Sequence, residues 1–131
     1  MRAGIQDRAR LESEIARVVE QLKQAGARKI ILFGSLARGE ISLFSDIDLI
    51  ALFDEDRTSG ELTRSLYQRL ETREAVDVLA YSLRSWHKLK DRPFFRHILS
   101  YGKVLYEEPD PGGQPVAAPG AVGSGVSGNR P

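Results

Sequence analysis

The 131-residue sequence contains no cysteine, which excludes disulfide bonds, thiolate zinc sites and a cysteine nucleophile. It also lacks any apolar run long enough to span a membrane. The amino-terminal stretch, MRAGIQDRARLESE, holds no apolar segment that could serve as a secretory signal. These absences favour a cytoplasmic protein with no membrane partner.

An excess of one charge is missing as well, because 19 Lys and Arg residues nearly balance 18 Asp and Glu residues. A formal net charge of +1 gives no general field for holding a nucleic acid backbone, so any charge-based chemistry must be local. A basic cluster at 84–96 is more typical of a solvated helical face than of a contact with nucleotide, RNA or an acidic partner.

Hydrophobic periodicity predicts helices and strands in alternation. An apolar stripe with helical spacing runs from Leu11 to Leu22, and Gly26 follows as a stop signal. Further helices are predicted after the Thr58–Glu61 capping box, after Ser82, and after Asp91 with Pro93 in its first turn. Apolar, β-branched runs predict strands at 29–33, 46–53, 75–81 and 103–106. The aromatic residues expected in the core are Trp86, Phe94 and Phe95.

This order of elements indicates an α+β domain with a central mixed β-sheet of about four strands flanked by helices. The short link between 29–33 and 46–53 favours the mixed arrangement. Residues 109–131 carry five of the six prolines and six of the twelve glycines, with little apolar bulk. Such a segment buries too little surface to offset its ordering entropy. We therefore expect one folded domain at 1–108 and a disordered tail at 109–131.

Two aspartates, Asp46 and Asp48, lie two residues apart in a predicted strand, so their side chains leave the same face. Like charges this close repel each other, and a divalent cation between them reverses the repulsion. Ligand sets made only of oxygen suit Mg²⁺ or Mn²⁺. Asp77, on the strand predicted at 75–81, is placed to join that face. Three such carboxylates can hold the two metal ions used in phosphoryl and nucleotidyl transfer.

Other interpretations of these acidic residues stay open. Asp46 and Asp48 could lie on a solvent-facing edge strand, and Asp77 could be an ordinary exposed strand residue. Glu74, at a predicted helix end, and Asp54, in a predicted loop, are rival third ligands.

A glycine-serine turn follows the strand predicted at 29–33. Gly34 lets the backbone come close to a ligand, and the amides that open the short helix after it form an anion-binding nest. The Ser35 hydroxyl can donate to a phosphate oxygen and can also cap that helix. Arg38 lies one helical turn further on and either reaches the same phosphates or covers the helix. The pattern predicts a triphosphate beside its metal ions.

The stretch FGSLARGEISLFSDIDLIALF resembles the nucleotidyltransferase motif of the DNA polymerase beta-like superfamily, in its minimal nucleotidyltransferase branch. That motif is Gly-Ser, ten residues and Asp-x-Asp, matched here by Gly34, Ser35, Asp46 and Asp48. The stretch AVDVLAY resembles the strand that bears the third carboxylate, matched by Asp77. The resemblance covers roughly residues 10 to 107. It implies that the three aspartates bind Mg²⁺, that Asp77 helps to deprotonate the attacking hydroxyl, and that Gly34 and Ser35 hold the phosphates of ATP.

Members of this branch often pair with HEPN-domain toxins, and the resemblance implies an antitoxin that attaches AMP from ATP to a tyrosine of its toxin. A catalytically silent antitoxin of the same fold is an alternative. A further alternative is an adenylyltransferase acting on a small molecule such as an antibiotic, although such enzymes usually carry a second domain to enclose the acceptor. The sequence leaves the acceptor and the formation of an oligomer open.

Overall fold

The computed structural model describes residues 5–40 and 46–109. Five helices and four strands follow one another in this part of the chain. In chain order they are α1 (Ile5–Gln24), β1 (Ala27–Phe33), α2 (Gly34–Ala37), β2 (Ile47–Phe53), α3 (Ser59–Arg69), β3 (Val76–Ser82), α4 (Leu83–Leu89), α5 (Pro93–Tyr101) and β4 (Lys103–Glu107). All four predicted strands are present, with bounds shifted by one or two residues. The predicted tail lies outside the described residues, apart from Pro109.

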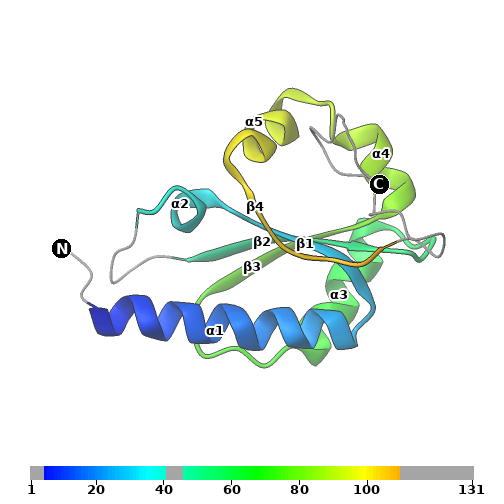
Figure 1. Cartoon of the computed structure of the whole chain (residues 1–131). Coiled ribbons are helices and arrows are strands. Elements are labelled where there is room, and N and C mark those ends of the chain that lie inside the picture. Colours follow the sequence, from blue (N-terminus) through cyan, green and yellow to red (C-terminus); the bar gives the residue numbers. More distant parts are fainter. Residues whose placement is uncertain (1–4, 41–45, 110–131) are drawn as a thin grey trace.

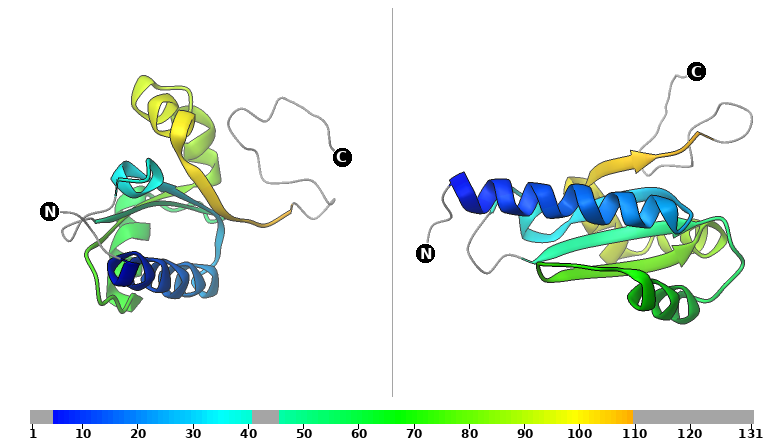
Figure 2. Two further views of the ribbon diagram at one scale, coloured as in Figure 1. Left: turned by 60° about the vertical axis from the view of Figure 1, so that its left-hand side comes forward. Right: turned by 90° about the horizontal axis from the view of Figure 1, so that it is seen from below.

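The strands form one mixed sheet in the order β3-β2-β1-β4. Strand β1 pairs antiparallel with β2 and with β4, whereas β2 and β3 run parallel. Helices α1 and α3 cover one face of the sheet, and α4 and α5 stand on the other (Figures 1 and 2). The α+β fold with a mixed four-stranded sheet is therefore confirmed.

Side chains alternate along β2 between two apolar cores, because successive strand residues point to opposite faces. Ile47, Leu49 and Ala51 belong to the core under α1 and α3. Ile50 and Leu52 belong to the core under α4 and α5, together with Trp86, Phe95 and Ile98. Strand β2 is thus buried on both faces and forms the centre of the domain.

The amino-terminal caps predicted for α3 and α4 are confirmed, and the cap predicted for α5 is wrong. Thr58 caps α3 in a reciprocal capping box with Glu61, and the Ser82 hydroxyl caps α4 by accepting from the Ser85 amide (3.1 Å). Asp91 does not cap α5, which begins at Pro93 with Arg92 in the N-cap position and no side-chain capping bond. Pro93 itself supplies a helical φ and needs no capping acceptor, so the helix starts without Asp91.

The prediction that Phe94 lies in the core is wrong, because its side chain is 59% exposed. Helix α5 places Phe95 and Ile98, three residues apart, against the sheet. Phe94 lies about 100° around the helix from Phe95, so it lies outside the buried stripe. Its ring forms a T-shaped contact with that of Phe95, at 5.0 Å between centroids. Trp86 and Phe95 are buried as predicted.

Candidate active site

The acidic residues lie at the start of the two parallel strands. Asp48 of β2 and Asp77 of β3 are direct partners in the strand register. Asp46 lies just outside the strand, one residue before Ile47. Because Ile47 and Val78 face the core under α1 and α3, alternation places Asp48 and Asp77 on the other face, which also carries α4 and α5. The structure thus brings Asp48 and Asp77 together, with Asp46 two residues before Asp48.

The glycine turn lies directly against this pair. Phe33, the last residue of β1, is the register partner of Asp48, and Gly34 follows it with a positive φ of 75°. A Cβ atom on Gly34 would lie only 2.2 Å from Oδ2 of Asp48. Glycine is required here both for the left-handed backbone and for the space taken by the carboxylate. The turn and the acidic residues therefore share one site.

Neighbouring negative charges affect the pKa of Asp48. Burial raises the pKa of Asp48, and the charges of Asp77 and Asp46 raise it further. An ionised Asp48 is thus held in an environment that disfavours its charge, and a bound cation would relieve this cost. A raised pKa of this kind, in a cluster with named charge partners, is typical of functional sites.

The donor atoms offered here are all carboxylate oxygens, which is the ligand type that Mg²⁺ and Mn²⁺ prefer. Across the described residues, no three His, Cys, Asp or Glu side chains converge closely enough to form a ready-made metal cage. The donor chemistry therefore fits a magnesium ion.

The rival third ligands lie elsewhere. Asp54 follows the opposite end of β2, where it pairs with Arg28 (3.1 Å). Glu74 precedes β3 and pairs with Arg10 of α1 (3.3 Å). Of the candidates considered, Asp77 alone is in register with Asp48.

Ser35 follows the glycine in α2, and Arg38 is the residue directly after this helix. Ser35 does not cap this helix, since Phe33 holds the N-cap position, but its carbonyl accepts from the amides of Arg38 (3.1 Å) and Glu40 (2.9 Å). These bonds close the turn tightly. The Arg38 guanidinium lies over the ring of Tyr101, 4.5 Å from its centroid, and donates to its hydroxyl (3.2 Å). Tyr101 was not anticipated from the sequence, because it enters the site from α5, 67 positions beyond Gly34.

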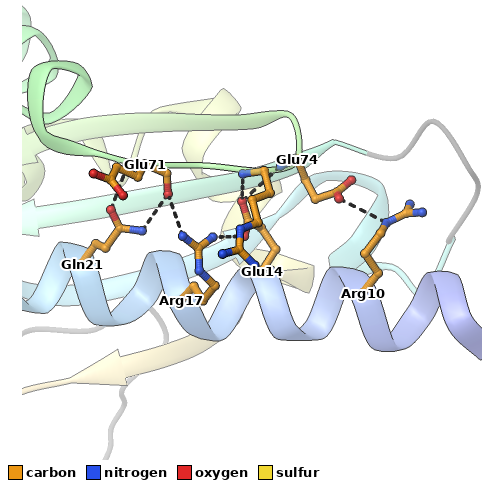
Figure 3. A network of polar contacts seen from close by, with 7 residues as sticks. Arg10, Glu14, Arg17, Gln21, Glu71 and Glu74 are labelled. Atoms are coloured by element: carbon orange, nitrogen blue, oxygen red, sulfur yellow. Dashed lines mark hydrogen bonds and ion pairs between the residues drawn. The ribbon is translucent and has the colours of Figure 1, made fainter.

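A polar network fixes the segment that leads into β3 (Figure 3). The buried carboxylate of Glu14, on α1, accepts from the backbone amides of Arg73 and Glu74, and it pairs with Arg17. Two turns beyond Glu14, Gln21 exchanges two hydrogen bonds with the backbone of Glu71, at 2.8 and 2.9 Å.

The same segment continues directly into the acidic site. The carbonyl of Ala75 accepts from the amide of Ile47 (2.9 Å), and this bond begins the β2–β3 pairing that sets Asp48 opposite Asp77. A sequence signal for Glu14 does exist, since it stands within the apolar stripe of α1, three residues after Leu11. A charged residue in such a stripe points to a specific buried partner.

Comparison with known proteins decides the family. The model of the family described as Polymerase beta, Nucleotidyltransferase matches residues 13–110. The chain belongs to this nucleotidyltransferase family. It is accordingly an enzyme of the nucleotidyltransferase class, and the matched range includes the Gly34-Ser35 turn and the acidic residues.

Two curated relatives come from Methanocaldococcus jannaschii. "Putative protein adenylyltransferase MJ0435" is 39% identical over 83 residues, which are 61% of this chain and 87% of the relative. "Putative protein adenylyltransferase MJ0604" is 33% identical over 100 residues, which are 72% of this chain and 97% of the relative. A crystal structure of a "putative nucleotidyltransferase" from Sulfolobus solfataricus superposes with a TM-score of 0.59 at 18% identity, over 82% of this chain and 92% of that one. This last likeness supports the fold alone.

None of the helices in the part of the chain that the structure describes combines the length and the apolar content needed to span a bilayer.

Proposed function

We propose that this chain is a magnesium-dependent adenylyltransferase that transfers AMP from ATP to a hydroxyl group of an acceptor protein. The observation that carries the proposal is the register of Asp48 against Asp77, with the Gly34 turn pressed against Asp48. The names of the two relatives from Methanocaldococcus jannaschii support a protein as the acceptor, since each describes a protein adenylyltransferase.

In this proposal each residue has a stated role. Asp46, Asp48 and Asp77 would hold Mg²⁺, which when bound neutralises charge on the phosphates. Asp77 would take the proton of the acceptor hydroxyl, whose oxygen forms a bond to the α-phosphorus of ATP. The bond between that phosphorus and the bridging oxygen breaks, and pyrophosphate leaves. Gly34 and Ser35 would hold the phosphates, with Arg38 beside them, so that the reacting atoms are aligned.

The acceptor we propose is a tyrosine of a HEPN-domain toxin encoded beside this chain, which makes the chain its antitoxin. The basis is the resemblance of the motif to the minimal nucleotidyltransferases, and the names of the relatives are in keeping with it.

The test uses ATP labelled at the α-phosphate, Mg²⁺ and the neighbouring HEPN protein. Wild-type protein should label the toxin, and the paired substitutions Asp46→Asn and Asp48→Asn should abolish labelling. Equal labelling by the doubly substituted protein would eliminate the assigned site. If that protein still neutralises the toxin and the wild type transfers no label, the chain is a binding antitoxin without catalysis.

A further inference from the structure

The carboxy-terminal end of α5 meets the glycine turn, although the two are far apart in the sequence. Gly102 makes this contact possible: a Cβ atom on it would lie 3.0 Å from the Ile98 carbonyl oxygen, 3.1 Å from Ile31 and 3.2 Å from the Leu32 carbonyl oxygen. The last turn of α5 therefore sits directly on β1, just before Gly34. This packing fixes the position of Tyr101.

The hydroxyl of Tyr101 accepts two hydrogen bonds. One comes from the Gly34 amide (3.3 Å) and the other from the Arg38 guanidinium (3.2 Å). A phenolic oxygen has two acceptor positions and one proton to donate. Because both acceptor positions are taken, the proton is directed away from these two donors. A further acceptor at the turn, such as a phosphate oxygen, would receive that proton.

Arg38 is held in place by the same tyrosine, through stacking on the ring and the bond to its hydroxyl. Within the described residues, no carboxylate forms an ion pair with Arg38 that would neutralise it. A guanidinium that is oriented but lacks an anionic partner is well suited to binding phosphate.

We infer that Tyr101 is a further nucleotide-binding residue: its hydroxyl donates to a phosphate of the bound triphosphate and its ring orients Arg38 toward the same group. The inference rests on the proposed function for the identity of the ligand. It adds α5 to the site and makes the position of that helix part of nucleotide binding.

Binding of α,β-methylene ATP with Mg²⁺, measured by calorimetry without any acceptor, tests the inference. Tyr101→Phe keeps the ring and the stacked Arg38 but removes the hydroxyl, so it should weaken binding about tenfold. Binding of pyrophosphate should weaken by a similar factor, whereas binding of AMP should change much less.

The matched control is Tyr106→Phe. Tyr106 of β4 packs against the same core as Tyr101 and also lies beside a cation, with Lys23 Nζ 4.7 Å from its ring centroid. This variant should bind the analogue like the wild type. In an Arg38→Gln background, the effect of Tyr101→Phe should shrink to about threefold, because part of the contribution of the tyrosine passes through Arg38.

Unchanged binding by Tyr101→Phe would overturn the inference. Tighter binding would also overturn it, since the hydroxyl would then block the Gly34 amide rather than serve the ligand. If the wild type and Tyr106→Phe both fail to bind the analogue, the proposed function is wrong. Failure of the proposed function and failure of the role of Tyr101 are therefore distinguishable.

Discussion

The two faces of the sheet are built from the same strands and differ in how their polar groups are satisfied. Under α1 and α3, the buried carboxylate of Glu14 has two backbone donors and an arginine. On the face that carries α4 and α5, Lys29 Nζ and Trp86 Nε1 are buried without a hydrogen-bond partner in the described structure. The same face holds Asp48 in an environment that raises its pKa. The face under α1 and α3 therefore stabilises the fold, whereas the other face retains unfavourable polar groups, among them Asp48.

The largest expected effect is at Asp48. Asp48→Asn should lower AMP transfer about a thousandfold, because under the proposed function it removes a charged ligand of Mg²⁺. The same substitution should increase the stability of the folded protein. The folded-state pKa of Asp48 is raised, so this residue costs stability as pH rises through that pKa. The substitution removes this cost and should raise the melting temperature by about 2–4 °C at pH 8, and by less at pH 4.

Labelling assays and thermal melts of the same preparation check both halves of this prediction. A variant that is both inactive and less stable at pH 8 would contradict the idea that Asp48 is retained at a cost to the fold.

Gly34 tests the contact between the turn and the acidic pair. Gly34→Ala should cost about 2–3 kcal/mol and most of the activity, because the residue has a positive φ and the new methyl group meets Asp48. Gly39→Ala is the matched control: Gly39 has a φ of 81° but nothing within 4 Å of a Cβ atom, so it should lose only about 1 kcal/mol. Denaturant melts measure both, and equal losses would mean that contact with Asp48 carries no cost.

On the face covered by α1 and α3, Glu14→Ala should destabilise the protein by about 2–3 kcal/mol, since it leaves two backbone amides without their acceptor. Burial alone would raise the pKa of Glu14, but the hydrogen bonds from Arg73, Glu74 and Arg17 outweigh it and lower the value below its usual 4.5. The contribution of Glu14 is therefore present above pH 4.5 and lost as pH falls through the lowered pKa. Unfolding curves of wild type and variant should converge in acid; a constant difference at all pH values would refute the role of the charge.

The smallest effect is expected at Lys29. Its ammonium is fully buried, 3.6 Å from Glu107 Oε2, and burial lowers its pKa despite that partner. Replacing both residues, Lys29→Met with Glu107→Leu, should be neutral or stabilise by up to about 2 kcal/mol. Wild type should also gain stability as pH rises toward 10.5 while the double variant does not. A clear loss of stability in the double variant would show that this buried pair supports the fold.

Much of the fold follows from local patterns. The alternation in 46–53 and 75–81 predicts that Asp48 and Asp77 share one face, as their register shows, and the sequence spacing predicts the glycine-serine turn. Contacts between residues far apart in the sequence cannot be predicted from such local patterns. Tyr101 reaches the site because α5 ends on β1, and Phe94 is exposed because α5 turns Phe95 and Ile98 toward the sheet. Both depend on the orientation of one short helix, which no local pattern encodes.

Strands β2 and β3 begin at the acidic site, so their last residues, Phe53 and Ser82, lie at the far end of the sheet. In most open α/β sheets, ligands meet the carboxyl ends of the strands, where helix amino termini help to hold anions. Here α3 and α4, the helices that follow these strands, start at the end of the sheet opposite the acidic site. Their amino-terminal dipoles therefore do not act on that site. The exposed connection at 54–57 is consequently a suitable position for a fluorophore or an affinity tag that should leave turnover intact.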